Sequence, residues 1–140
     1  MSQLIDQVFA ALAHATAIRP PVGGFPHFAE ALRRAGFTHN YWTLPSGQSI
    51  VVTNAGAVSI QGPVSATSPV DIPSFDRDAL IAAIRADQAG TTTFPEFLTG
   101  AWQAGVVRYT VDFAARTVAY FGVHGEEYVE AYPPVEIGPA

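Results

Sequence analysis

One short cluster in the second half of the sequence has the residue types of an acid–base pair. His124, Gly125, Glu126 and Glu127 place an imidazole two residues from a carboxylate. Histidine titrates near neutral pH, and a carboxylate can orient it for general acid–base work. The alternative is an ordinary hairpin turn, because turns between strands commonly carry polar side chains. His124 and Glu126 are therefore candidate residues without an assigned catalytic role.

A second cluster combines one histidine with two aromatic side chains. His39, Tyr41 and Trp42 lie close together in the first half of the chain. Aromatic side chains around a polar group are typical of ligand pockets. The alternative is an edge or interface strand whose aromatics pack against a neighbour. We treat His39, Tyr41 and Trp42, with His124 and Glu126, as candidate ligand or interaction residues, and we assign no catalytic residue.

Metal and nucleotide sites find no support in the spacing of the remaining residues. The chain has no cysteine, and its four histidines show neither HxH nor HxxxH spacing, so we expect no metal site. Its glycines form neither of the two phosphate-binding patterns, and no serine lies in a GxSxG context. We therefore expect no metal and no cofactor.

The charge balance argues against two classes of partner. Seven basic residues, all arginine, face 12 acidic ones, which gives a net charge of −5. Nucleic-acid binding depends on clustered positive charge, and anionic membrane surfaces attract the same kind of patch. Only Arg33 and Arg34 are adjacent. We expect neither nucleic-acid nor membrane-surface binding.

The composition also predicts self-association. Charged residues make up 14% of the chain, against about 25% in ordinary soluble domains. Hydrophobic residues reach 49%, so some apolar surface is expected in a subunit contact, most simply a homodimer. No run approaches the ~20 apolar residues of a membrane span, and no basic residue precedes the apolar N-terminal segment. We read that segment as a helix of a cytoplasmic protein.

The periodicity of the sequence predicts four helices and six strands. Leu4–Ala17 has helical spacing, and Gly36 and Gly105 are natural ends for the two helices that contain Pro26 and Pro95. Thr93 and Glu96 fit a capping box. A fourth helix is predicted over 76–88, and strands are predicted over 37–44, 49–53, 58–61, 106–113, 117–121 and 127–131.

An internal duplication underlies this order of elements. The pattern Phe-Pro-x-Phe-x6-Ala-Gly occurs at 25–36 and again at 94–105, and the same offset relates Gly56 to Gly125. We predict a single α+β domain, residues 1–140, of two α-α-β-β-β repeats at about 4–62 and 74–137, with a Pro/Ser/Thr-rich linker at 62–73. We expect their antiparallel sheets to lie side by side or face to face, with helices packed on one face.

Two parts of the repeats correspond less cleanly. The first helices match only at a different offset, which predicts a longer loop after the first helix of the first repeat. Tyr41 would match Tyr109 only if one residue were inserted. The copies also diverge where the first carries His39, Tyr41 and Trp42. We expect any specialised function to involve this segment of the first repeat.

The second repeat resembles a known family. The segments that carry the likeness are Ala82-Ala83-Ile84-Arg85, Gln88-Ala89-Gly90, Phe94-Pro95-Glu96-Phe97, Ala104-Gly105, and Val118-Ala119-Tyr120-Phe121-Gly122 leading to Gly125-Glu126. They resemble the YbcV-like family of small bacterial and prophage-associated proteins, sometimes labelled phage envelope proteins. The resemblance covers most of the chain and is best from Asp76 to Pro133. The segment Asn40–Pro45 departs from the regular strand expected there. The family implies a duplicated α+β fold without an established activity.

Three functional hypotheses follow. The leading one is a non-catalytic domain that acts through self-association or a protein partner. The second is a small-molecule binder or weak hydrolase whose pocket lies between the repeats and uses His39, Trp42, His124 and Glu126. The third is a phage structural protein.

Overall fold

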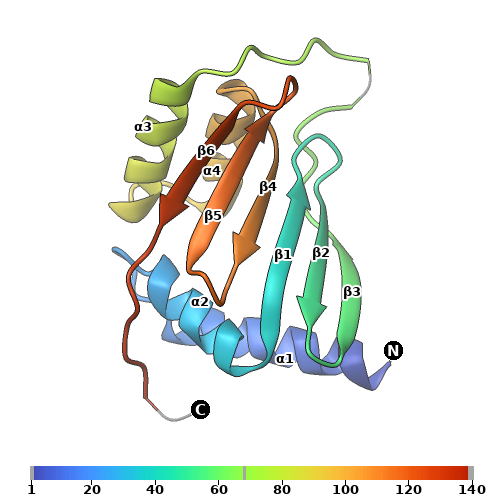
Figure 1. Ribbon diagram of the computed structural model, residues 1–140, viewed down its shortest axis with the longest axis vertical. Coiled ribbons are helices and arrows are strands. Elements are labelled where there is room, and N and C mark those ends of the chain that lie inside the picture. Colours follow the sequence, from blue (N-terminus) through green and yellow to red (C-terminus); the bar gives the residue numbers. More distant parts are fainter. Residues whose placement is uncertain (1, 68, 139–140) are drawn as a thin grey trace.

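The computed structural model describes residues 2–67 and 69–138 (Figure 1). Position 68 of the predicted linker and both ends of the predicted domain lie outside them. The chain forms, in order, α1 (Gln3–Ile18), α2 (Phe25–Arg34), β1 (Phe37–Thr43), β2 (Gln48–Thr53), β3 (Gly56–Gln61), α3 (Arg77–Gln88), α4 (Phe94–Gln103), β4 (Val106–Asp112), β5 (Thr117–Gly122) and β6 (Glu127–Ala131). This confirms the α+β class and the predicted order of elements.

The six strands form one antiparallel sheet in the order β3-β2-β1-β4-β5-β6. The two repeats are thus joined side by side, and β1 and β4 pair at the centre with His39 opposite Asp112 and Thr43 opposite Arg108. Helices pack in pairs, α1 with α2 and α3 with α4. The sheet lies in front of the helices in the view of Figure 1, so one of its faces carries no helix.

The repeats correspond closely from the second helix to the second strand. The starts of α2, β1 and β2 precede those of α4, β4 and β5 by 69 residues in each case. A β-bulge lies between Phe37 and His39 and again between Val106 and Arg108, at equivalent positions. After the bulge, β1 and β4 keep the same 69-residue offset, so neither strand has an inserted residue relative to the other. Tyr41 therefore corresponds to Thr110 and not to Tyr109, which fixes the strand register that the sequence left open.

Backbone conformation repeats as well. Gly36 and Gly105, at the exits of α2 and α4, both have positive φ, of 99° and 86°. The turns between the first two strands of each repeat also use a positive φ, at Gly47 in the first and at Arg116 in the second, where φ is 56°. An L-residue with a side chain strains the backbone in this region by roughly 1–2 kcal/mol. The conformation at Arg116 therefore needs compensating contacts.

The leading helices are the least similar elements. α1 has 16 residues and α3 has 12. With Leu12 aligned to Ile84, the first repeat has three extra residues before its next helix, of which two extend α1 and one lengthens the loop. The extra residues that were expected in the loop after the first helix thus mostly extend α1 itself.

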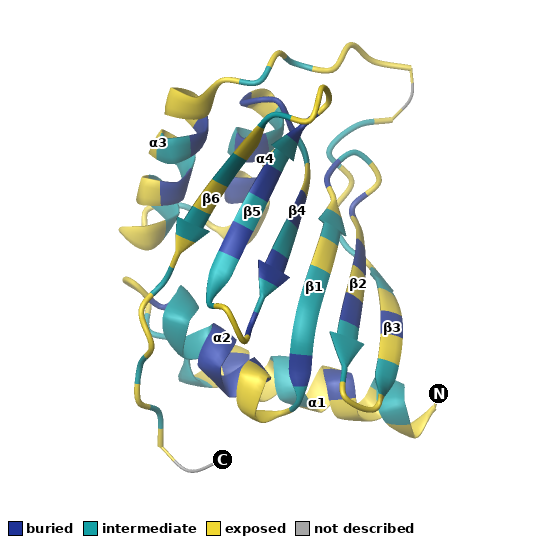
Figure 2. Cartoon of the chain, viewed as in Figure 1, coloured by how far each residue is buried: buried dark blue, intermediate teal, exposed yellow. Residues whose placement is uncertain are grey.

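The core lies between the sheet and the helices, as the dark blue patches in Figure 2 show. Strand residues alternate between the two faces, so every second one points toward the helices. Leu44 and Phe113, which follow β1 and β4 at equivalent positions, are 1% and 2% exposed. The predicted capping box of α4 is present, because Thr93 and Glu96 each bind the other's backbone N–H through their side chains. Among the residues that the structure describes, the other large side chains that are fully buried are Leu32, Leu80, Val8 and Val106.

The two helix-exit glycines should respond differently to alanine. At Gly105 a Cβ atom would lie 2.5 Å from the Phe75 Cα, whereas at Gly36 it would meet only the Asn54 side chain at 3.5 Å. Both substitutions place alanine at positive φ, but only Gly105→Ala adds a backbone clash. We expect Gly36→Ala to lower the free energy of unfolding by about 1 kcal/mol and Gly105→Ala by about 2 kcal/mol. Chemical denaturation checks this, and equal losses would contradict it.

Candidate functional site

His39 and Tyr41 lie on the face of the sheet that carries no helix. The His39 Nε2 is 3.5 Å from the Asp112 carboxylate of the neighbouring strand. The His39 and Tyr41 rings are stacked, with centroids 5.7 Å apart and planes within 4°. His39 and Asp112 side chains are each about a third exposed. The pair therefore links the two repeats across the centre of an accessible surface.

This surface, which we call the open sheet face, consists of three rows that cross all six strands. Its residues share an outward direction, and none of them is buried. Tyr41, Ile50 and Val129 are 42%, 43% and 47% exposed. The only acidic or basic side chains in the rows besides His39 are Arg108, Asp112 and Glu127. The rows are Ala57, Val52, His39, Asp112, Thr117, Ala131; Ser59, Ile50, Tyr41, Thr110, Ala119, Val129; and Gln61, Gln48, Thr43, Arg108, Phe121, Glu127.

Arg108 is exposed on this face and contacts an aromatic neighbour on the adjacent strand. Its guanidinium lies 4.1 Å from the centroid of the Phe121 ring, in cation–π contact. Two side-chain contacts thus lie within this surface: His39 with Asp112, and Arg108 with Phe121.

Trp42 lies on the opposite face from its two neighbours in the predicted cluster. Its ring packs on Tyr109 at 5.9 Å and on Phe94 at 5.4 Å. Its Nε1–H donates to Asn40 Oδ1 at 2.8 Å. Successive strand residues point to opposite faces, so Trp42 belongs to the helix side, where it holds β1 against α4. The cluster predicted from sequence is divided between the two sides of the sheet.

His124 and Glu126 lie in the turn between β5 and β6. The backbone N–H of His124 donates to Glu126 Oε1 at 2.9 Å, and Gly125 has a φ of 86°. The carboxylate therefore stabilises the turn through the backbone. No hydrogen bond or ion pair between the His124 ring and Glu126 occurs within the described part of the chain.

The structure does not bring His39 and His124 together. His39 lies in the same row as Thr117, where β5 begins, while the turn with His124 follows Gly122, where β5 ends. Five residues of strand separate these positions, which is roughly 17 Å. The five candidate residues therefore form no common pocket.

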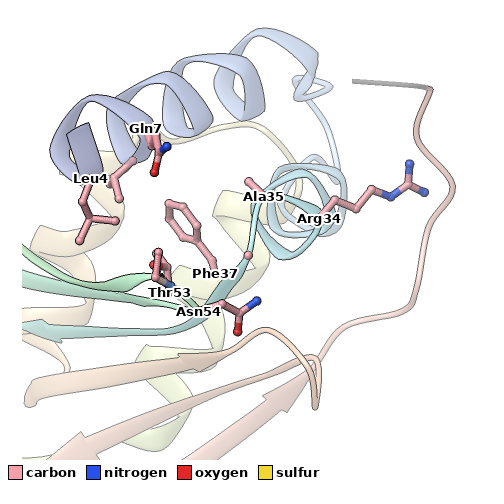
Figure 3. A pocket seen from close by; sticks show the side chains of 10 residues that line it. Leu4, Gln7, Arg34, Ala35, Phe37, Thr53 and Asn54 are labelled. Atoms are coloured by element: carbon pink, nitrogen blue, oxygen red, sulfur yellow. Dashed lines mark hydrogen bonds between the residues drawn. The ribbon is translucent and has the colours of Figure 1, made fainter.

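Two shallow cavities lie elsewhere. One, of about 210 Å³, is lined by α1, the end of α2 and the turn between β2 and β3 (Figure 3). The other, of about 240 Å³, lies between the repeats and is lined by residues that include Arg19, Asp87 and Thr92. Burial raises the pKa of Asp87, and the Arg19 guanidinium 3.8 Å away opposes that shift. Neither cavity is lined by a predicted site residue.

A buried carboxylate, Glu30, is not among the site residues predicted from sequence. Glu30 on α2 is 6% exposed and accepts two hydrogen bonds from Arg33, at 2.9 and 2.7 Å, and one from Arg34 at 3.0 Å. Arg116, from the turn between β4 and β5, approaches it to 3.8 Å. These hydrogen bonds, Arg33 first, outweigh burial and lower the pKa of Glu30 to about 2.

Part of this cluster could have been found from sequence. Arg33 and Arg34 follow Glu30 by three and four residues, and side chains at this spacing meet on a helix surface. Arg116 comes from the other repeat, and no local pattern indicates it. The cluster therefore connects α2 of the first repeat to the turn between β4 and β5 of the second repeat.

Two classes of structure are not found in the described residues. Within 2–67 and 69–138, no three His, Asp or Glu side chains are grouped so that they could hold a metal ion. Over the same ranges, no helix combines the length and the apolar character that crossing a membrane requires.

Residues 21–130 match a family described as "Protein of unknown function (DUF1398)". This span runs from the loop before α2 into β6 and so includes most of both repeats. The chain belongs to this family. Relatives include an uncharacterized protein of Mycobacterium bovis and one from each of two Mycobacterium tuberculosis strains, CDC 1551 and H37Rv. Each is 50% identical over 136 residues, which cover 97% of this chain and 83% of the relative.

The DUF1398 description gives no activity. It supports the expectation of an uncharacterised family, while the YbcV-like label and the prophage link stay predictions. A functional proposal for this DUF1398 chain must therefore be based on the geometry of its surfaces and cavities.

Proposed function

We propose that this chain is a non-catalytic association module whose open sheet face is covered by a second copy of the chain. The observation that supports the proposal is the open sheet face itself. Antiparallel sheets can leave one face to solvent, and such a face is ordinarily polar. Here Tyr41, Ile50 and Val129 are more than two-fifths exposed. Covering them would remove apolar surface from water, which favours association.

A second copy suits this face for electrostatic and geometric reasons. Besides His39, its acidic and basic side chains are Arg108, Asp112 and Glu127, which are few and of mixed sign, so two copies can meet with little charge repulsion. Arg108 already shields part of the Phe121 ring. Two sheets pack face to face about 10 Å apart with their strands inclined by about 30°, which lets side chains of both faces interdigitate. Closed pairs of identical chains are also the commonest soluble assembly.

Sedimentation velocity over roughly 1–200 µM, a range typical of modest interfaces, tests the proposal. We expect a dimer for the wild type. Tyr41→Glu and Ile50→Glu should each weaken it by at least ~10-fold, because a carboxylate would have to be buried in the contact. Val64→Glu is the matched control, since Val64 is 57% exposed outside the sheet. A wild-type monomer throughout, or dimers unaffected by both face variants, would rule the proposal out.

A ligand pocket built from His39, Trp42, His124 and Glu126 is not part of this proposal, because these residues occupy different faces and ends of the sheet. The hydrolase and phage alternatives gain no support from the site.

A further inference from the structure

The cavity in Figure 3 has a counterpart in the second repeat. Three of its lining residues are Ala35, Gly36 and Thr53. At the 69-residue offset of the repeats, the equivalent positions are Ala104, Gly105 and Gly122, which have the same places at the helix exit and the end of the second strand. The two locations therefore have the same backbone frame and can be compared directly.

In the second repeat this location is filled by the segment that precedes α3. A Cβ atom on Gly105 would lie 2.5 Å from Phe75 Cα, and one on Gly122 would lie 3.0 Å from Cδ1 of the Phe75 ring. The backbone N–H of Asp76 donates to Ala104 O at 2.8 Å. An aromatic ring and a neighbouring N–H donor thus occupy the site together. Ala104 is 1% exposed as a result.

In the first repeat the same location is open. Ala35 is exposed, and a Cβ atom on Gly36 would meet only Asn54 Nδ2 at 3.5 Å. Within residues 2–67 and 69–138, Ala35 O accepts no backbone hydrogen bond in a turn, loop or cap. The two repeats also differ in the chain before this location: α1 is helical from Gln3, whereas residues 70–76 form no helix or strand.

We infer that this cavity binds a small ligand that combines one aromatic ring with an adjacent N–H donor. The ring would occupy the position that Phe75 has in the second repeat, and the N–H would reach Ala35 O as that of Asp76 reaches Ala104 O. The volume of about 210 Å³ suits a group of this size. This binding site is separate from the open sheet face.

The walls of the cavity fit such a ligand. Phe37 and Val8 are 4% and 2% exposed and give an apolar floor. Figure 3 shows the Phe37 ring directed toward Leu4 and Gln7 of α1, and an added ring can meet it edge to face. Asn54 and Gln7 supply polar groups at the rim. Arg34 points away, and its Nη1 donates to Ile137 O at 3.3 Å, so the ligand need not be anionic.

A compact ligand fits better than a peptide segment. The first two turns of α1 contribute Leu4, Gln7 and Val8 to the cavity, so a helix forms one of its walls. This helical wall and the volume of about 210 Å³ limit the size of the group that the cavity can hold.

The test uses N-acetylphenylalaninamide as the probe and amide chemical shifts of the full chain as the readout. We expect saturable shifts at Gly36, Phe37 and Asn54, and none with N-acetylalaninamide, which lacks the ring. Gln7→Phe would fill the cavity and should weaken binding by at least ~10-fold, because the probe loses the space for its ring. Gln3→Phe, on the same helix but outside the cavity, should bind as the wild type does.

A second variant keeps the inference testable if Gln7→Phe does not fold. Phe75→Ala should open the equivalent location, so the probe should then also shift Gly105 and Gly122 while it keeps its site at Gly36. No saturable shift in the wild type up to ~10 mM, which is weaker than useful fragment binding, would overturn the inference. Shifts confined to another surface, or binding of the peptide Pro-Ser-Phe-Asp-Arg without binding of the small probe, would also overturn it.

Discussion

Replacing Phe113 by alanine should lower the free energy of unfolding by about 4 kcal/mol, the largest single loss expected in this chain. Phe113 is 2% exposed and packs edge to face on Phe37, with ring centroids 5.9 Å apart. Phe113 follows β4, and Phe37 begins β1, so the contact joins the two repeats in the core. The substitution removes apolar burial and leaves a cavity that the surrounding sheet cannot fill completely. Guanidinium denaturation followed by circular dichroism gives the difference.

Phe9→Ala is the matched control for this prediction. Phe9 is 45% exposed on α1 and takes no part in the buried core. Its loss should cost less than about 1 kcal/mol, as is usual for surface positions. Similar costs for Phe9→Ala and Phe113→Ala would contradict the assignment of Phe113 to the centre of the core.

Glu30→Gln should lower the free energy of unfolding by about 2 to 3 kcal/mol at pH 7. The pKa of Glu30 is lowered from 4.5 to about 2, and each pKa unit corresponds to about 1.4 kcal/mol. The arginine side chains that hold it are 40% and 42% exposed, so solvent screening reduces the full conversion. Glutamine keeps the shape of the side chain but loses the charge that Arg33, Arg34 and Arg116 stabilise.

The pH dependence of this loss has a definite sign. A carboxyl whose pKa is lower in the folded state stabilises the fold above its unfolded pKa, and that stability disappears as the pH falls through the folded value. The difference between wild type and Glu30→Gln should therefore be full above about pH 4.5 and fade toward pH 2. Glu136→Gln, at an exposed position, should change stability little at any pH. A Glu30→Gln difference that stays constant from pH 7 to pH 2 would disprove this role.

The elements that could be predicted from sequence are those set by local interactions. Pro26 and Pro95 begin helices because proline tolerates the first helical turn, and Gly36 and Gly105 end them because they allow positive φ. The capping box of Thr93 was readable for the same reason. Each of these features depends on residues that lie only a few positions apart, so a local sequence pattern is enough to predict it.

The arrangement of the candidate residues depended on pairing between the repeats, which local patterns do not specify. The central pairing of β1 with β4 places His39 beside Asp112 and leaves His124 beyond the far end of β5. One part of this was predictable, since Tyr41 and Trp42 are adjacent on a strand and must point to opposite faces. The contact of Arg116 with Glu30 joins residues 86 positions apart and has no sequence signal.

The asymmetry of the repeats is wider than the sequence indicated. We expected the difference to centre on His39, Tyr41 and Trp42. The structure adds the contrast between Gly47 and Arg116 and the contrast between α1 and the Phe75 segment. At each of these positions the two repeats have the same backbone path but different side chains or segments.

Hydroxyl-radical footprinting at two protein concentrations tests most directly whether a second copy covers the open sheet face. One sample is diluted below the dissociation constant found by sedimentation, and the other is concentrated well above it. We predict that the labelling of Tyr41 and Phe121 falls several-fold in the concentrated sample, because contact between the faces excludes solvent. Labelling of Phe9, on the outer side of α1, should stay unchanged. Equal labelling of Tyr41 and Phe121 at both concentrations in a sample shown to be dimeric would place the contact elsewhere and contradict the proposal.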